Sequence, residues 1–434
     1  MRGTGFGSFL VIWGGQVVSQ TGTAMTRFAL LIWVYEQTGR AASVALLGFS
    51  SFVPFVVVSP LAGVWVDRLD RRRVMFWADL GAGLATATLL VLFTTGRLAV
   101  WHLYAAEAVA GACEAFQVPA FTAATTMLVP ARHYGRASGL RSIATLGSDG
   151  VAPFAAGVAL AWVGVAGIML IDLATLLVAL AALLAARVPS PPTGEPGLPS
   201  PSHFRAELAG GARYIVERPG LLGLLLIHSG MNLFAALTYY AVLPAMVLAR
   251  SGHSALALAS VQSANGLAGL AGGIVMSIWG GPRRKIHGVL AAAAVSFLIG
   301  DLLFAVGRSV AVWVAGAFLG SLLVPVIVGC NLAIWQARVA PAIQGRVFGI
   351  VGAARVATMP VGYLVGGFVA DLWMEPSMAA GGWLAPRLGW LVGVGPGAGI
   401  AAMFLATAVL GSAMSLVGYL FASVRSVEDP RASC

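Results

Sequence analysis

Residues 60–74 decide the fold of this chain, and they read PLAGVWVDRLDRRRV. The stretch is apolar up to Val66, continues with Asp67 and Arg68, and then holds the basic run Arg71 to Arg73. Arginines gather in the loops on the inner side of membrane proteins, so an apolar run that ends in such a cluster is typical of a helix leaving a bilayer. The stretch therefore predicts one membrane-spanning helix before the arginines and another after them.

Composition agrees with a lipid environment for most of the chain. Of the 434 residues, 59% are hydrophobic and 10% are charged, and the mean hydropathy is +0.89. Soluble proteins carry roughly 45–50% apolar and about 25% charged residues. These values exclude a soluble enzyme, a nucleic-acid binder and a disordered chain. The net charge is +10, and the basic residues behind it lie between apolar segments. They therefore indicate how the chain is oriented in a membrane and not a nucleic-acid partner.

A helix needs about 20 mostly apolar residues to cross the hydrocarbon core. Twelve stretches meet this requirement, and each lacks the alternation of a barrel strand. Arginine and lysine concentrate in the loops on the side of the N-terminus, which predicts a multi-pass protein of the plasma (inner) membrane with both termini cytoplasmic. The predicted spans are 8–35, 42–65, 74–95, 98–128, 137–162, 164–186, 221–249, 256–280, 286–307, 309–337, 346–372 and 397–422.

A proline-rich segment divides the spans into two groups of six. Pro189–Pro201 contains six prolines, which is typical of an extended linker, and His203–Arg218 has the spacing of an amphipathic helix on the inner surface. Basic runs recur at Arg71 and Arg283, about 210 residues apart, which indicates duplication of a six-span unit. The predicted domains are an N-terminal bundle (1–188), a cytoplasmic linker (189–220) and a C-terminal bundle with a short tail (221–434).

The basic loop carries a family resemblance. Gly63, Asp67, Arg68 and the run Arg71, Arg72, Arg73 resemble the signature loop between spans two and three of the major facilitator superfamily. Further features are similar to the macrolide-efflux branch of that superfamily: Ala78-Asp79-Leu80, Pro119-Ala120, Gly345-Arg346-Val347-Phe348, Glu375-Pro376 and Gly395-Pro396-Gly397. The resemblance implies an all-α integral membrane protein of 12 transmembrane helices in two six-helix bundles. It also implies export of amphipathic or hydrophobic small molecules by proton antiport.

The signature loop can be interpreted physically. Gly63 is expected to permit close helix approach, as small residues do in membranes. Asp67, where its span leaves the bilayer, is expected to accept hydrogen bonds from a helix N-terminus or to pair with an arginine, and so to act in gating. The run Arg71 to Arg73 either anchors the loop to anionic lipids or forms a charge latch that releases during alternating access.

Ionisable residues at membrane depth are candidates for function. Counted from the outer ends of their spans, Arg27, Glu107 and Asp172 lie at similar depth. We expect an Arg27–Glu107 pair, with Asp172 as a rival or third member. The pair either locks the spans together or breaks and re-forms as the outer side opens.

Two deeper carboxyls are candidates for coupling. Glu114 follows Glu107 by seven residues, which is about 10 Å along the same helix face and level with Gln20. Low dielectric favours the neutral form of a carboxyl, so such a group can bind and release a proton, and a cationic substrate can compete with that proton. Glu114 is the first candidate for the proton or substrate carboxylate, and Asp149 the second. The alternative for each is a protonated carboxyl bonded to a neighbouring helix.

Other polar residues carry weaker expectations. Asp79 is expected to support the signature loop, and Asp301 and Asp371, nearer outer ends, are expected to be solvated. Asn232 is a candidate substrate contact in a polar patch of the second half, together with Tyr239, Tyr240, Gln262 and Asn265.

No catalytic cluster, phosphate-binding loop or metal-ligand spacing is present in the sequence, so neither an enzyme nor a cofactor is expected. The proton gradient is the expected energy source. The expected partners are a small-molecule substrate and the bilayer, and the expected state is a monomer. A dedicated exporter of one compound, such as a siderophore or lysolipid, is the alternative within transport. A membrane scaffold or sensor is the alternative outside transport.

Overall fold

The computed structural model describes residues 5–130, 146–186, 201–340 and 343–429, together with 133, 136, 137, 139, 140 and 144. The side chains of Val64, Asp67, Arg68, residues 201–208, Gly345 and Arg346 are outside the description. The predicted proline linker lies almost entirely in 187–200 and is likewise not described.

The chain is an all-α membrane protein. Within the described ranges, nine helical stretches are long and apolar enough to cross a membrane. Two further long helices, α1 (Gly5–Thr38) and α4 (Val100–Leu128), pack between such stretches. The side chains exposed on the helices are largely apolar, for example Trp162 and Ile278, as expected where lipid is the solvent. The predicted all-α membrane fold is confirmed, and the described helices are consistent with the twelve predicted spans.

The helices form two compact units. Unit 1 comprises Met1–Thr193 and Val247–Gly266, and unit 2 comprises Gly194–Met246 and Leu267–Cys434. The placement of Val247–Gly266 with unit 1 has a local cause, because Gly157 and Gly150 lack side chains and let Ala259 and Gly266 approach their backbone.

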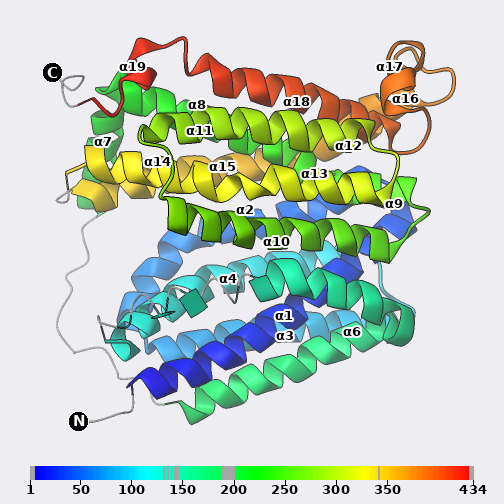
Figure 1. Cartoon of the computed structure of the whole chain (residues 1–434). Helices are drawn as coiled ribbons and strands as arrows, with labels where there is room; N and C mark the ends of the chain where they lie inside the picture. Colours follow the sequence, from blue (N-terminus) through cyan, green and yellow to red (C-terminus); the bar gives the residue numbers. More distant parts are fainter. Residues whose placement is uncertain are drawn as a thin grey trace. The chain divides into compact units, whose positions relative to one another are not determined.

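Unit 1 is built around α1, which packs along α6 and also contacts α4 (Figure 1). The predicted spans 8–35, 42–65, 74–95 and 98–128 coincide with its first four helices. Gly164, with φ 64° and ψ −175°, breaks α6 at the predicted boundary between 137–162 and 164–186, a conformation that favours glycine. The remaining elements are α2 (Ala41–Arg68), α3 (Arg71–Thr94), η2 (Gly147–Val151) and α6 (Ala152–Ala185).

Unit 2 contains several helices with short π-helical turns, such as η3 between α8 and α9 and η4 between α11 and α12. Within it, α11 packs along α14 and α18 (Figure 1). Its elements are α7 (Pro201–Val216), α8 (Pro219–Ala235), η3 (Ala236–Tyr240), α9 (Leu243–Arg250), α10 (Ala255–Trp279), α11 (Lys285–Ser296), η4 (Phe297–Asp301), α12 (Leu302–Val306), α13 (Val310–Leu322), α14 (Val324–Arg338), α15 (Gln344–Val369), η6 (Ala370–Met374), α16 (Glu375–Met378), α17 (Ala385–Val392), α18 (Ala398–Val417) and α19 (Ala422–Arg425). Parts of α9 and α10 lie in Val247–Gly266 and belong to unit 1.

The predicted surface helix 203–218 is present as α7. Tyr214 donates a hydrogen bond to the Arg338 carbonyl at 2.9 Å, and Ile215 is buried in the core of unit 2. On the exposed face, a hydrogen bond from Arg213 to the Glu217 carboxylate raises the pKa of Arg213. The helix therefore docks on unit 2 by its apolar face.

Candidate functional site

The signature loop is organised by an acidic cap. Asp70 accepts hydrogen bonds from the backbone N–H groups of Arg72 and Arg73, at 2.9 and 3.4 Å, and so caps the start of α3. The Arg72 guanidinium donates to the Leu184 carbonyl near the end of α6, which anchors the loop to protein and not only to lipid. The buried Nε and Nη1 of Arg71 have no partner in the described part of the chain.

The expectation for Gly63 is wrong in this conformation. Among the described residues, a Cβ added at Gly63 would meet nothing within 4 Å, whereas one added at Gly111 of α4 would collide with the Ser51 carbonyl of α2. Gly111 is therefore the glycine at which α2 and α4 approach closely. The side chains of Asp67 and Arg68 are not described, so their proposed gating role stays a prediction.

The structure brings Arg27, Glu107 and Glu114 together in unit 1. Arg27 Nε lies 3.4 Å from a Glu107 carboxylate oxygen, which is the predicted pair, and Arg27 Nη2 lies 3.5 Å from Glu114. The contact with Glu114 was not predicted. One guanidinium thus faces two carboxylates, whose side chains are 16% exposed at Glu107 and 48% exposed at Glu114. We call Arg27, Glu107 and Glu114 the outer cluster. Glu114 is its more accessible acid.

Asp172 is not the third member of that cluster. Its buried carboxylate accepts hydrogen bonds from Thr23 of α1 at 2.9 Å and Thr86 of α3 at 3.3 Å, so it joins α6 to two neighbouring helices. Among the described side chains, no cation lies within ion-pair distance of Asp172, although the charge of Arg27 acts on it from further away. Asp172 lies on α6 between α1 and α3. Threonines of these two helices therefore supply the hydrogen bonds that its carboxylate needs.

A second polar cluster, the inner cluster, consists of Gln16 of α1, Asp79 of α3 and Gln117 of α4. Gln16 Nε2 donates to Asp79 at 2.7 Å, and Gln117 Nε2 donates to Gln16 Oε1 at 2.8 Å. Asp79 therefore serves the interior of unit 1 and not the signature loop, contrary to expectation. Gln20, which the sequence placed at the same depth as Glu114, is exposed. Gln16, one helical turn earlier on α1, is buried instead. A polar residue on a mostly apolar helix was the available signal.

The remaining candidates stand apart. Asp149 in η2 is exposed, and its carboxylate accepts a hydrogen bond from Ser148 at 3.0 Å. Asn232 on α8 is half-buried, and its Nδ2 has no partner within the described residues. Within unit 1, Asp149 has no described contact with the outer or the inner cluster, and Asn232 belongs to unit 2.

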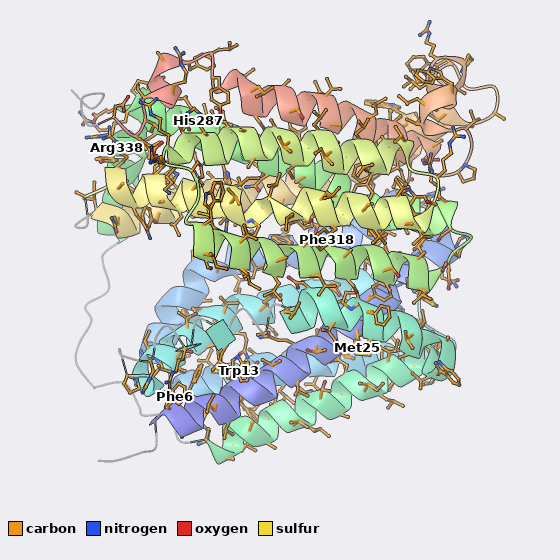
Figure 2. All side chains as sticks on the ribbon, in the orientation of Figure 1. Phe6, Trp13, Met25, His287, Phe318 and Arg338 are labelled. Carbon is orange, nitrogen blue, oxygen red and sulfur yellow. The ribbon has the colours of Figure 1, made fainter. Side chains whose placement is uncertain are left out.

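In unit 2 the acidic partner of the second basic loop comes from the end of the chain. Glu428 accepts hydrogen bonds from the backbone N–H groups of Lys285 and Ile286, both at 2.9 Å, and so caps α11 as Asp70 caps α3. Arg284 lies 3.4 Å from Asp429. Figure 2 shows His287 and Arg338 at the same end of unit 2, where Arg338 donates to the Asp429 carbonyl at 3.0 Å.

The expectation that Asp301 is solvated is wrong. Asp301 is 7% exposed and lies 2.6 Å from the Thr407 hydroxyl of α18. The π-helical turn η4 holds it there, and Phe304, one turn further along, packs on Phe404 with ring centroids 5.0 Å apart. Asp301 lies only a few residues from the end of its predicted span, which suggested an exposed position. In the structure α18 covers it.

Membrane-spanning helices, an arginine-rich signature loop and charged side chains at membrane depth are the features of a multi-pass membrane transporter. The model of the Major Facilitator Superfamily matches residues 12–363, and the chain belongs to this superfamily.

The curated relatives include macrolide efflux proteins. The chain is 28% identical over 372 residues to Macrolide efflux protein A of Streptococcus pyogenes. This alignment covers 84% of this chain and 89% of that protein. It is also 28% identical over 329 residues to Macrolide efflux protein A of Enterococcus faecalis, covering 74% of this chain and 98% of that one. Among solved structures, a mutant of the nucleoside transporter NupG aligns with a TM-score of 0.72 at 12% identity, covering 94% of this chain and 99% of NupG. That likeness concerns the fold alone.

Proposed function

We propose that this protein exports amphipathic or hydrophobic small molecules of the macrolide or multidrug type, by alternating access and in exchange for protons. The observation that carries the proposal is the likeness to Macrolide efflux protein A over most of both chains. The substrate and the bilayer are the proposed partners, the protein works as a monomer without a cofactor, and its termini lie on the cytoplasmic side of the plasma membrane. The N-terminal bundle, linker and C-terminal bundle remain the proposed domains.

The outer cluster supports proton exchange. Arg27 offsets one carboxylate charge, so the pair Glu107 and Glu114 carries one negative charge in excess when both are ionised. The second carboxylate can take up a proton, or the cationic group of a substrate, without leaving Arg27 unpaired. Glu114 is the better candidate because its side chain is more exposed than that of Glu107. Asp149, also exposed, is the second candidate.

Uptake of macrolides and lipophilic cations into proteoliposomes under an imposed pH gradient tests the proposal. Wild type is compared with Glu114→Gln and with the matched control Glu217→Gln, which removes a carboxylate from the exposed Arg213–Glu217 pair on α7. We expect gradient-dependent accumulation in wild type and control, and its loss in Glu114→Gln. Unchanged accumulation in Glu114→Gln would move coupling to Asp149. No gradient response for any compound would contradict proton-driven export.

A further inference from the structure

The inner cluster forms a directed chain of hydrogen bonds across three helices. Gln117 Nε2 of α4 donates to Gln16 Oε1 of α1, and Gln16 Nε2 donates to the carboxylate of Asp79 on α3. An ionised carboxylate only accepts hydrogen bonds, whereas an amide has a donor end and an acceptor end. An ionised Asp79 therefore fixes the orientation of Gln16, and Gln16 in turn fixes the orientation of Gln117.

The far end of this chain is unsatisfied. Gln117 Oε1 is buried and has no hydrogen-bond donor among the described residues. A buried polar atom without a partner destabilises the folded protein, so its presence calls for a functional explanation. The free atom is an acceptor, and a ligand that satisfies it must bring an N–H or O–H group.

Protonation of Asp79 permits the opposite direction. After half-turns of both amides, the Asp79 hydroxyl donates to Gln16 Oε1, and Gln16 Nε2 donates to Gln117 Oε1. No covalent bond changes apart from the O–H bond formed at Asp79 with a proton from water. The free end of Gln117 becomes its Nε2, which repels the donor group that Oε1 would accept.

The groups around Asp79 leave the carboxyl without a cation. On α4 the Cys113 thiol lies within range of the Asp79 charge, and Glu114 follows it directly in sequence. On α6 Asp172 is bonded to Thr86, which lies seven residues, or about 10 Å, beyond Asp79 along α3.

The described positive groups on the helices packed against Asp79 are not in contact with its carboxyl. Arg27 follows Gln16 on α1 by eleven residues, roughly 16 Å, and is engaged by Glu107 and Glu114. The arginines that open α3, Arg71 to Arg73, precede Asp79 by six to eight residues, roughly 9–12 Å along the helix, and Arg72 donates a hydrogen bond to the Leu184 carbonyl. On α2 the charged residues are Asp67 and Arg68, whose side chains are not described. None of the described cations is in contact with Asp79, so proton uptake is the direct way to neutralise it.

We infer that Asp79, Gln16 and Gln117 form a proton-controlled binding site for a hydrogen-bond donor of the substrate, such as an ammonium or hydroxyl group. With Asp79 ionised, Gln117 offers an acceptor oxygen to the donor. With Asp79 protonated, the chain reverses and the donor is released. The inference rests on the proposed export function and adds to it a second proton-linked carboxyl, Asp79, whose hydrogen-bond chain ends at Gln117, three residues after Glu114 on α4.

Infrared difference spectroscopy tests the reversal without any ligand or gradient. The full-length protein in lipid, with isotope-labelled glutamine, is compared between acid and alkaline buffer. We expect a carboxyl band and a glutamine amide change that titrate together in wild type, and loss of both in Asp79→Asn. Gln16→Met should keep the carboxyl band and lose the amide change. Persistence of the amide change in Gln16→Met would overturn the inference, as would its absence in wild type.

Equilibrium binding of two probes tests the ligand class. Erythromycin carries ammonium and hydroxyl donors, whereas tetraphenylphosphonium is a cation without a donor. Over a range in which the erythromycin amine stays protonated, acidification should weaken erythromycin binding by up to about tenfold per pH unit, the limit for competition with one proton. Tetraphenylphosphonium should respond less, and Gln117→Leu should weaken erythromycin binding and reduce its pH dependence to that of tetraphenylphosphonium.

Two outcomes of the binding test would overturn the assignment of the ligand. Equal pH dependence for both probes would mean that charge alone acts, and full pH dependence in Gln16→Met would mean that the amide chain is not used. Both measurements are independent of export. A protein that shows the reversal but no gradient-driven transport would contradict the proposed function and leave the inner site standing.

Discussion

Replacing Glu428 by alanine should open the N-terminal end of α11. The change removes both carboxylate oxygens that accept the Lys285 and Ile286 N–H groups at 2.9 Å. Loss of a helix cap costs about 1 kcal/mol, and loss of a negative charge at a helix N-terminus about 0.3–1 kcal/mol more. We therefore expect the free energy of local opening to fall by about 1–2 kcal/mol, which raises the open population about 5- to 30-fold.

Cys330 reports this opening. It is fully buried, packs against Gly281 and Gly288, and shares a core cluster with Ile286, Val424 and Val427. Alkylation of Cys330 by a maleimide, measured peptide by peptide so that Cys113 and Cys434 do not interfere, follows the open population when closing is faster than reaction. Glu428→Ala should therefore accelerate alkylation about 5- to 30-fold.

Two further variants sharpen the test. Glu428→Gln should have an intermediate effect, because its amide oxygen can replace only one of the two acceptors. Asp429→Asn should change the rate less than either, because its side chain makes one exposed contact of 3.4 Å with Arg284. An unchanged rate in Glu428→Ala would refute the capping argument, and so would an effect of Asp429→Asn that equals it.

Three other predictions follow from the packing of the two units. Gly111→Ala should destabilise the protein by about 1–3 kcal/mol, because the added Cβ meets backbone, and so lower the thermal midpoint in detergent. Gly63→Ala should leave the midpoint unchanged. Equal midpoints for the two variants would contradict this. Asp301→Asn should cost less than about 1 kcal/mol in the same assay, since the amide keeps the shape and a hydrogen bond to its threonine partner; loss of folded protein would argue for an essential charge. A double-mutant cycle of Arg27→Met and Glu107→Gln should give a coupling of about 1 kcal/mol or less, since Arg27 is 40% exposed, and zero coupling would show that the pair contributes nothing.

Much of the fold and part of the candidate site follow from the sequence. The helix rise is fixed at 1.5 Å per residue, so counting from the ends of two antiparallel spans placed Arg27 opposite Glu107, and the two are in contact. The same counting located the break between two spans at Gly164. Distances along one helix axis are therefore readable from sequence alone.

What the sequence does not supply is rotation about the helix axis and contact across long separations. Gln16 and Gln20 differ by one turn, yet Gln16 is buried and Gln20 exposed, because a turn of 3.6 residues shifts a position four residues on to a slightly different face. Glu428 caps a helix that begins 143 residues earlier, which no local pattern reveals. Asp301 was misjudged because the count along its own helix ignores α18, which supplies Thr407.

The cap on α11 also has a consequence for synthesis of the chain. Lys285 leaves the ribosome 143 residues before Glu428 does. At about 5–20 residues per second, the start of α11 exists for roughly 7–30 s before its capping carboxylate has been made. During that interval water, lipid headgroups or a chaperone must bind the exposed N–H groups. The second basic loop therefore reaches these hydrogen bonds only after 143 further residues have been made, whereas Asp70 caps α3 from within its own loop.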